Sequence, residues 1–305
     1  MKNFVLIGAA GFIAPRHMRA IKDTGNKLVA ALDPHDSVGV LDSYFPDTDF
    51  FTEFERFDRH CEKLRRSGTP IDYVVVCSPN YLHDAHIRFG LRIGADVICE
   101  KPVVLNPWNL DGLLEMEKET GKNVYTILQL RNHPDISLLK NKVQAATGNQ
   151  RHEVNVKYVS VRGHWYKYSW KGDVSKSGGI TTNIGLHFFD ILLWIFGEVE
   201  EIQVTQAGPG FVSGTLLLAK AKVKWELGTE EQSLPAEIKN EGKTTYRMLS
   251  VDGANIEFSS GFADLHTACY SEILSGKGVS LTEMKRLTEL LYRVRLLEQE
   301  SAGSA

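Results

Sequence analysis

Six short apolar runs alternate with amphipathic stretches over about the first 130 residues. The runs lie at 4–7, 27–32, 49–54, 72–77, 96–99 and 123–130. Apolar runs of this length, separated by helical patterns, are typical of parallel strands whose connections are helices. This alternation predicts an α/β domain, a doubly wound parallel sheet of Rossmann type with helices on both faces.

The pattern changes at about Glu153, where apolar and polar residues begin to alternate. A period of two predicts strands that bury one face. We expect an α+β part on an open, mostly antiparallel sheet, with strands near 153–164, 200–206, 213–229, 244–251 and 254–258 and helices near 183–196, 263–275 and 282–299. The chain should therefore form two domains: 1–131 for nucleotide binding and 132–305 for substrate binding and oligomerisation.

A glycine turn, Gly8–Ala14, follows the first strand and leads into a helix from about Pro15 to Thr24. This order is typical of dinucleotide-binding proteins, in which free backbone amides and the helix dipole meet a pyrophosphate. The spacing is G-x-x-G-x-x-A rather than G-x-G-x-x-G, so Gly11 must supply the close backbone approach. A plain tight turn would show the same glycines.

Asp33 ends the second strand, about twenty residues beyond the glycines. A carboxylate at this place accepts hydrogen bonds from a ribose 2′-hydroxyl and repels a 2′-phosphate, which favours NAD over NADP. The alternative is that Asp33 only caps the turn Asp33–Asp36.

Lys101 stands in Glu100-Lys101-Pro102, immediately after the buried strand at 96–99. Ligands of open α/β sheets bind outside the carboxyl ends of the strands, so Lys101 is predicted to face the ligand. A solvated loop lysine is the alternative. The preceding strand ends in polar residues that could line the same crevice, Ser78, Asn80 and His83.

A metal site is not predicted. His83 and His86 share a helix face, yet no third ligand follows them at a suitable spacing. The four cysteines are scattered without paired or metal-type spacing, which suggests reduced, buried thiols.

Asn183, His187 and Asp190 form one polar stripe, at i, i+4 and i+7, on an otherwise apolar helix. Polar groups on such a helix are costly unless they are paired or used. The alternative is that Asn183 is an N-cap and His187 a satisfied core histidine.

Four aromatic side chains and three cations are interleaved in Arg162–Lys171. This composition could stack on sugar or base rings and bind phosphate or carboxylate. An exposed strand or a subunit contact would have the same composition.

The net charge is −3, from 35 basic and 38 acidic residues, and no basic block is present. Nothing in this balance indicates a nucleic-acid or membrane partner. The most apolar segment, Ile184–Phe196, is shorter than a membrane span and carries His187 and Asp190. We expect a cytoplasmic protein that binds small molecules.

The chain resembles the glucose-fructose oxidoreductase, inositol dehydrogenase and MocA family. The resemblance is carried by Gly8–Ala14, Asp33, Ser78–Asn80, Glu100–Pro102 and Asn183–Asp190. It implies a Rossmann domain, NAD as cofactor, a second domain with an open sheet that also mediates assembly, and commonly a homotetramer.

Within that family, residues 8–17 and 162–173 are similar to members that act on a UDP-linked uronic acid. The similarity implies oxidation of the 3-hydroxyl of UDP-N-acetylglucosaminuronic acid to the 3-keto sugar, in bacterial lipopolysaccharide and O-antigen sugar biosynthesis. Related enzymes recycle NADH by reducing 2-oxoglutarate. The alternatives are another sugar or inositol dehydrogenase, an NAD-dependent glycosidase, or a catalytically silent NAD-binding regulator.

The resemblance makes Lys101 and His187 the catalytic residues. His187 is our first choice for the base because its ordinary pKa needs little tuning, with Lys101 as the alternative. The family's histidine motif usually begins with aspartate, whereas this chain has Asn183, which leaves the division of acid–base work open.

Two sets of binding residues are expected. The cofactor set is Gly8, Gly11, Phe12, Ile13, Asp33, His35, Ser78, Asn80, His83, Glu100, Lys101, Gln129 and Trp165. The substrate set is Lys101, Arg131, Trp165, Tyr166, Lys167, Asn183, His187, Phe262 and His266.

Overall fold

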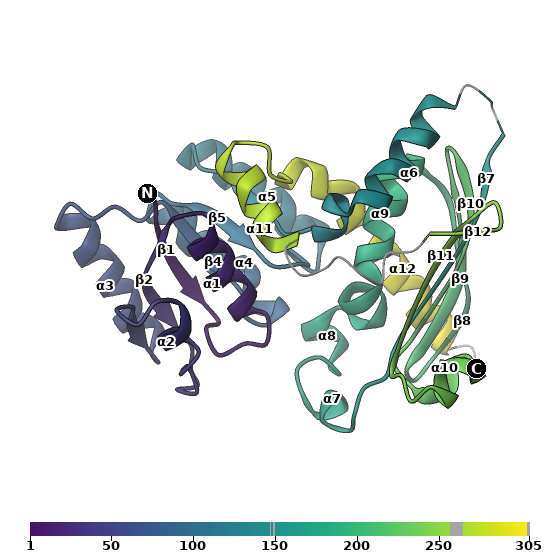
Figure 1. Cartoon of the computed structure of the whole chain (residues 1–305), viewed down its shortest axis with the longest axis horizontal. Coiled ribbons are helices and arrows are strands. Elements are labelled where there is room, and N and C mark those ends of the chain that lie inside the picture. The colour runs from purple at the N-terminus through teal and green to yellow at the C-terminus, as the bar shows by residue number, and fades with distance from the viewer. Residues whose placement is uncertain (147, 149, 257–264, 304–305) are drawn as a thin grey trace. The chain divides into compact units, whose positions relative to one another are not determined.

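The computed structural model describes residues 1–146, 148, 150–256 and 265–303. These form two compact units (Figure 1). The first contains residues 1–129 with 265–285, and the second contains residues 130–256 with 286–303.

The first unit is built on a six-stranded sheet in the order β3-β2-β1-β4-β5-β6, and every neighbouring pair is parallel. The strands are β1 (Asn3–Ile7), β2 (Lys27–Leu32), β3 (Asp49–Phe51), β4 (Tyr73–Val76), β5 (Asp96–Cys99) and β6 (Val124–Thr126). The predicted doubly wound parallel sheet is confirmed. Its strand order reverses between β1 and β4, which is where such sheets bind nucleotides.

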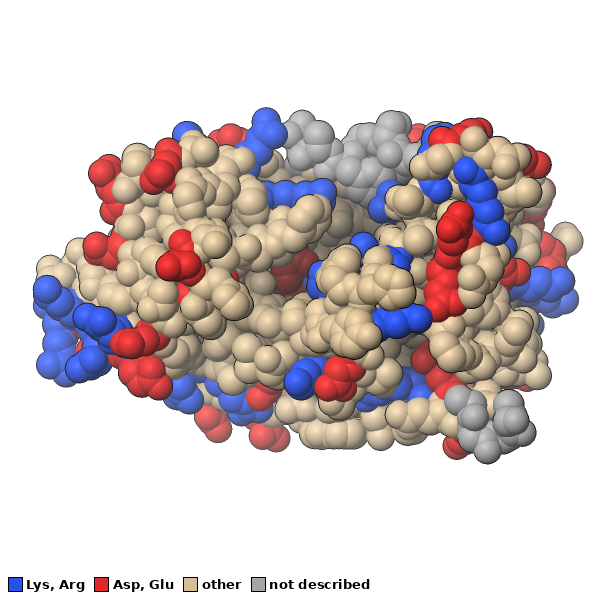
Figure 2. Space-filling view, turned by 90° about the horizontal axis from the view of Figure 1, so that it is seen from below, with Lys and Arg blue, Asp and Glu red and all other residues tan. Residues whose placement is uncertain are grey.

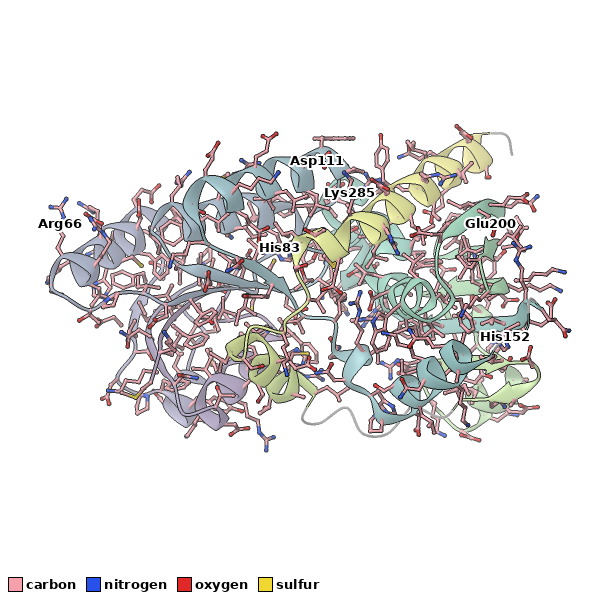
Figure 3. All side chains as sticks on the ribbon, turned by 90° about the horizontal axis from the view of Figure 1, so that it is seen from above. Arg66, His83, Asp111, His152, Glu200 and Lys285 are labelled. Atoms are coloured by element: carbon pink, nitrogen blue, oxygen red, sulfur yellow. The ribbon has the colours of Figure 1, made fainter. Side chains whose placement is uncertain are left out.

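Helices cover both faces of this sheet. They are α1 (Ala14–Asp23), α2 (Leu41–Tyr44), α3 (Phe54–Arg66), η1 (Asn80–Leu82), α4 (His83–Arg92), α5 (Pro107–Thr120) and α11 (Leu265–Leu274). In Figure 3, α1 and α11 lie together on one face and α3, α4 and α5 on the other. Asp111 on α5 pairs with Lys285 at 3.4 Å.

The α11 helix departs from the expected domain division, which assigned all of 132–305 to the second domain. It packs on α1, and Tyr270 stacks on Phe4 of β1 with ring centroids 6.0 Å apart. Tyr270 and Ile273 are buried in the hydrophobic core of the first unit, and residues 265–285 therefore belong to that unit. Sequence periodicity shows that a helix is apolar on one side but not which sheet covers it.

The second unit contains a six-stranded sheet in the order β12-β11-β7-β10-β9-β8. Its strands are β7 (His152–Ser160), β8 (Val199–Gly208), β9 (Phe211–Leu218), β10 (Ala221–Gly228), β11 (Thr245–Val251) and β12 (Ala254–Asn255). Only β7 and β10 pair in parallel, so the prediction of a mostly antiparallel sheet is confirmed. The expected single strand at 213–229 is instead the hairpin β9–β10, since the Ala219-Lys220 turn lacks the usual turn residues.

In this unit α6 packs against α9, and both helices lie on the same side of the sheet (Figure 1). The helical elements wholly within this unit are α6 (Pro134–Ala145), α7 (Trp165–Tyr168), α8 (Val174–Ser177), the π-helix η3 (Thr181–Gly185), α9 (Leu186–Phe196), η4 (Glu231–Ser233) and α10 (Ala236–Asn240). Two more, η2 (Gln129–Asn132) and α12 (Leu281–Gly303), begin in the first unit and continue into the second. Phe189 of α9 meets Trp225 of β10 edge to face, with centroids 5.4 Å apart. Trp225 is 1% exposed, so this pair lies at the centre of the core.

One described helical stretch, Val174–Phe196, is long and apolar enough to cross a membrane by length and composition. It exceeds the apolar segment Ile184–Phe196 because α8 and the π-helical turn extend the helical run upstream. The structure buries 72% of its most apolar window, as it would the core helix of a soluble protein.

Charged side chains of both signs are interspersed over the face drawn in Figure 2.

Candidate active site

The glycine turn is fixed by its two glycines. Gly8 has φ +96°, and a Cβ at this position would lie 2.6 Å from the Cys77 carbonyl carbon at the end of β4. Gly11 donates its N–H to Gly8 O at 3.1 Å, and a Cβ on Gly11 would lie 3.1 Å from that oxygen. Phe12, in the same turn, is 87% exposed. The turn thus opens onto the N-terminus of α1, as a dinucleotide cradle requires.

Replacing Gly8 with alanine should unfold or strongly destabilise the first unit. Gly25→Ala is the matched control, because Gly25 also has a positive φ, +72°, but a Cβ there meets nothing within 4 Å. We expect Gly25→Ala to lose about 1–2 kcal/mol from the backbone conformation alone. Gly8→Ala should lose clearly more in thermal unfolding. Equal melting temperatures for the two variants would show that the close approach to Cys77 is not needed.

Asp33 is buried at the end of β2 and accepts two backbone N–H groups. Its Oδ2 accepts from Ala10 in the glycine turn at 3.0 Å, and its Oδ1 accepts from His35 at 2.9 Å. The carboxylate therefore caps the turn Asp33–Asp36, and through Ala10 it also holds the glycine turn. Each oxygen keeps a further lone pair for a ribose hydroxyl, so that role stays a prediction. His35 itself is exposed.

His83 joins the loops that follow β4 and β5. Its Nδ1 lies 2.7 Å from Pro102 O and its Nε2 lies 2.7 Å from Ser78 O, and the ring is 1% exposed (Figure 3). Burial lowers the pKa of His83, while the two carbonyl oxygens oppose that shift. Both ring nitrogens thus face backbone carbonyl oxygens, so His83 ties the two loops together. Its contact with a cofactor stays a prediction.

Ser78 and Asn80 occupy the same strand end, both largely buried. Ser78 Oγ lies 2.8 Å from His86 Nδ1, and burial lowers the pKa of His86 to about 4. Their contact with a cofactor stays a prediction.

Lys101 lies just beyond β5 and is half-buried. Its backbone N–H donates to Oε2 of Glu100 at 3.2 Å, and the Lys101–Pro102 peptide is cis. The position at the carboxyl end of a central parallel strand is the one the sequence predicts.

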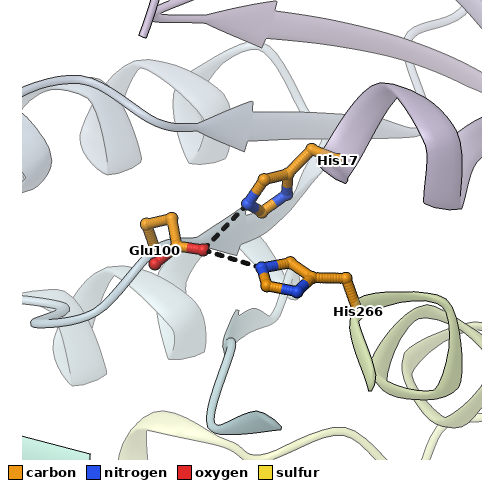
Figure 4. A group of neighbouring side chains, drawn as sticks. All are labelled: His17, Glu100 and His266. Carbon is orange, nitrogen blue, oxygen red and sulfur yellow. Dashed lines mark hydrogen bonds and ion pairs between the residues drawn. The ribbon is translucent and has the colours of Figure 1, made fainter. Parts of the chain in front are cut away.

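Glu100 is enclosed by two histidines (Figure 4). Its Oε1 lies 3.0 Å from His17 Nε2 and 3.2 Å from His266 Nε2, and all three residues are buried. Although burial raises the pKa of Glu100, the hydrogen bonds from His17 and His266 hold it well below its usual range. The three ligand atoms lie within 4.8 Å of one another, so this group could also hold a metal ion.

The π-helical turn Thr181–Gly185 interrupts the expected helix and carries Asn183. Between 181 and 192, Asn183 and His187 are the two residues that are not buried, so they share one accessible edge. Asn183 Nδ2 donates to Tyr166 Oη at 2.8 Å, and Gly185, not Asn183, precedes α9. The N-cap interpretation is therefore wrong. Single π-turns are frequent at functional sites.

Arg131 and Asp190 form a buried ion pair within the second unit. Arg131 Nε and Nη2 lie 3.0 and 2.7 Å from the two Asp190 carboxylate oxygens, and the side chains are 11% and 3% exposed. This bidentate contact explains why Asp190, the third residue of the polar stripe, is tolerated on an apolar helix. It also gives Arg131 a structural partner, whereas the sequence assigned Arg131 to the substrate.

The aromatic and cationic stretch forms the short helix α7 rather than a strand. Trp165 is 53% exposed and Tyr166 is buried. Lys171 lies 5.3 Å from the Trp165 ring centroid, and Lys167 pairs with Glu230 at 3.2 Å. Trp165 therefore presents a large ring surface beside a cation.

Three further residues were predicted to bind cofactor or substrate: Gln129, His266 and Phe262. Gln129 follows β6, and its buried Oε1 has no hydrogen-bond partner among the described residues, which is suited to a ligand contact. His266 forms a hydrogen bond with Glu100 within the first unit. Phe262 lies outside the described residues.

Two family models match the chain. One, an oxidoreductase family with an NAD-binding Rossmann fold, matches residues 2–127, and the C-terminal alpha/beta domain of that oxidoreductase family matches residues 151–213. The chain belongs to this family. It is the glucose-fructose oxidoreductase, inositol dehydrogenase and MocA family, so the chain is an NAD-dependent oxidoreductase and the predicted family, enzyme class and cofactor are confirmed.

A crystal structure of the WlbA (WbpB) dehydrogenase from Thermus thermophilus in complex with NAD and alpha-ketoglutarate is similar to the whole chain. It is 45% identical, covers 97% of this chain and 96% of that chain, and has a TM-score of 0.94. The same enzyme in complex with NAD and UDP-GlcNAcA gives 45% identity, 97% and 95% coverage, and a TM-score of 0.93.

More distant relatives share the family. The myo-inositol 2-dehydrogenase of Thermotoga maritima is 28% identical over 133 residues, which are 43% of this chain and 38% of that protein. The matched segments span 36–64% of the lengths of such curated relatives. The WlbA dehydrogenase of Bordetella pertussis, 17% identical with a TM-score of 0.80, covers 98% of this chain and 97% of that chain and shares the fold.

The residues that fit NAD are those of the first unit. Three features are suited to a dinucleotide: the cradle at Gly8 and Gly11, the buried carboxylate of Asp33, and Gln129 Oε1, to which no described residue donates. Sequence reasoning missed His17 and Tyr270, although His17 falls in step with the buried residues Ala14, Met18 and Ile21 of α1. A polar residue in phase with a buried face was the available signal.

Proposed function

We propose that the protein oxidises the 3-hydroxyl of UDP-N-acetylglucosaminuronic acid to the 3-keto sugar. The main support for this proposal is that 97% of the chain is covered, at 45% identity, by a dehydrogenase crystallised with NAD and UDP-GlcNAcA. At that identity over full length, a shared substrate class is the simplest interpretation. The accessible Trp165 ring, with Lys171 beside it, supports an aromatic and anionic ligand.

The proposed chemistry removes a hydride from the sugar C3 and a proton from the hydroxyl on the same carbon. Bound NAD supplies the hydride acceptor. His187 is proposed as the base that takes the hydroxyl proton, and Lys101 as the hydrogen-bond donor that favours the developing alkoxide. Asn183, one turn before His187, stands where the family's motif usually has aspartate, and its Nδ2 donates to Tyr166 Oη at 2.8 Å.

The remaining substrate residues in the proposal come from the second unit. Tyr166, Asn183 and Lys167 are proposed to line the sugar and phosphates beside Trp165. Arg131 stays a candidate for the uronate or diphosphate, although two of its guanidinium nitrogens are bonded to Asp190.

Alpha-ketoglutarate bound to the Thermus enzyme supports 2-oxoglutarate as the oxidant that regenerates NAD. We also propose that the protein is cytoplasmic. The family resemblance supports a homotetramer that acts in lipopolysaccharide and O-antigen sugar biosynthesis.

A substrate panel tests the proposal. Purified protein is incubated with UDP-N-acetylglucosaminuronic acid, UDP-N-acetylglucosamine, myo-inositol or free glucose, with 2-oxoglutarate present or absent. We expect a 3-keto product from UDP-N-acetylglucosaminuronic acid. This product should accumulate only when 2-oxoglutarate is present, because 2-oxoglutarate is the proposed oxidant that regenerates NAD. Turnover of inositol alone would favour the inositol dehydrogenase alternative, and release of free sugar without net NADH would favour a glycosidase.

Asp33→Asn should weaken the discrimination of NAD from NADP. The carboxylate repels a 2′-phosphate, and charges about 4 Å apart near a surface interact by up to about 4 kcal/mol, so we expect the ratio of the two dissociation constants to fall on the order of 10²-fold. Asp36→Asn, an exposed acid of the same turn, is the matched control. An unchanged ratio, measured by fluorescence titration, would limit Asp33 to its contacts with Ala10 and His35.

A further inference from the structure

We propose that Glu100 is a positioning residue whose carboxylate, held by His17 and His266, fixes the backbone from which Lys101 reaches the ligand. This inference rests on the proposed function and adds to it the device that sets Lys101 in place. Three elements of the first unit meet at this carboxylate: α1, the loop after β5, and α11.

The two oxygens of Glu100 have separate tasks. Oε1 accepts from His17 Nε2 at 3.0 Å and from His266 Nε2 at 3.2 Å, while Oε2 accepts the Lys101 N–H at 3.2 Å. An ionised carboxylate can accept all three because it has about four lone-pair sites and no hydrogen of its own.

The ionised carboxylate determines which nitrogen of His17 carries the hydrogen. Because Glu100 Oε1 can only accept, Nε2 carries the N–H that points at it, at 3.0 Å. His17 Nδ1 is then an acceptor, and it takes the hydrogen of the Tyr270 hydroxyl, whose Oη lies 2.8 Å away. Tyr270, His17 and Glu100 thereby form a hydrogen-bond chain that runs from α11 to the residue before Lys101.

Burial restricts the Glu100 carboxylate and its hydrogen-bond donors to their positions. His17 and Tyr270 are fully buried, His266 is 3% exposed and Glu100 is 7% exposed. A buried carboxylate that lost these donors would be strongly destabilised, so the carboxylate stays within reach of both histidines and of the Lys101 N–H.

The hydrogen bonds account for the cluster without a metal. Each histidine already directs an N–H at Glu100 Oε1, and a metal ion would require both nitrogens to be deprotonated lone-pair donors. The neighbouring thiols of Cys77 and Cys269 are held in the protonated form, because burial raises their pKa values, that of Cys269 to about 12.

Glu100→Gln separates the two tasks. Its amide oxygen can still accept from both histidines, which leaves the amide nitrogen, a donor, facing the Lys101 N–H. The variant thus keeps the contacts of α1 and α11 and removes the acceptor of Lys101. Glu117→Gln is the matched control, since Glu117 also accepts a backbone N–H, from Val124 at 2.6 Å, elsewhere in the same unit.

His266→Leu and His266→Gln test the other side. Leucine removes the donor to Glu100, whereas glutamine presents an N–H at about the position of the imidazole Nε2. The rescue of a leucine defect by glutamine would identify the hydrogen bond, rather than the ring, as the required feature.

The experiment measures four properties of the full chain: hydrogen–deuterium exchange of peptides containing residue 101, the dissociation constant of NAD, kcat and KM for the UDP-sugar, and metal content. For Glu100→Gln we expect faster exchange at residue 101, NAD affinity and KM within about threefold of wild type, and kcat lower by roughly 10- to 100-fold, as for a misplaced catalytic group. Glu117→Gln should match wild type in all four.

Three results would overturn the inference. Unchanged exchange at residue 101 in Glu100→Gln would show that the carboxylate does not hold Lys101. A large loss of NAD affinity would make Glu100 a direct cofactor contact, and stoichiometric metal lost in Glu100→Gln would make the cluster a metal site. If wild type turns over no sugar, the proposed function fails, while exchange, NAD affinity and metal content still decide the role of Glu100.

Discussion

Lys101→Met should reduce kcat on the UDP-sugar by about 10²–10⁴-fold while NAD still binds. Lys101, a half-buried residue just beyond β5, is the proposed donor to the developing alkoxide. General acid–base or oxyanion-stabilising groups contribute factors of this size. Methionine keeps the length of the side chain and removes its charge. Steady-state kinetics at saturating NAD, together with an NAD titration, measure both expectations.

His187→Asn is the companion variant that decides which residue is the base. If His187 takes the proton, wild-type kcat falls as the pH drops through the histidine pKa, and His187→Asn abolishes that limb while Lys101→Met retains it. If Lys101 is the base, the limb lies at higher pH and persists in His187→Asn. Near-normal turnover in both variants would refute both assignments.

Asp190→Asn should lower the stability of the second unit by about 3–5 kcal/mol. The substitution keeps the shape of the side chain but leaves the Arg131 guanidinium, 11% exposed, without its carboxylate, and breaking a buried ion pair has effects of this size. In thermal unfolding this corresponds to a loss of about 10 °C for a unit of this length.

The double variant Arg131→Met with Asp190→Leu is the control for that effect. Removing both charges together should restore most of the lost stability, because no charge is then left buried alone. Arg131→Met alone also tests the original assignment of Arg131 to the substrate. A raised KM with an unchanged melting temperature would show that Arg131 binds substrate and does not support the fold.

The fold could be predicted to a large extent because the signals are local. Short apolar runs such as Phe4–Ile7, with a glycine turn between strand and helix, specify a parallel sheet through steric rules that act within a few residues. The hairpin at Ala219-Lys220 was missed for the same reason, since its turn lacks a local signal. The place of the Glu100-Lys101-Pro102 triplet could likewise be predicted locally, because the triplet directly follows a buried apolar strand.

The partners of the polar side chains could not be predicted in this way. Arg131 and Asp190 are 59 residues apart, and His17 and Tyr270 are 253 residues apart, yet each pair is in direct contact. The sequence shows that such groups are buried and need partners, and several partners would satisfy each one equally well.

The sequence by itself determined the parallel sheet, the glycine cradle and the placement of Lys101 after β5. Only the tertiary structure decided that α11 returns to the first unit and brings His266 and Tyr270 to Glu100 and His17. The physical reason is that backbone sterics and hydrophobic periodicity act locally, whereas a buried hydrogen bond forms wherever packing brings a donor to an acceptor.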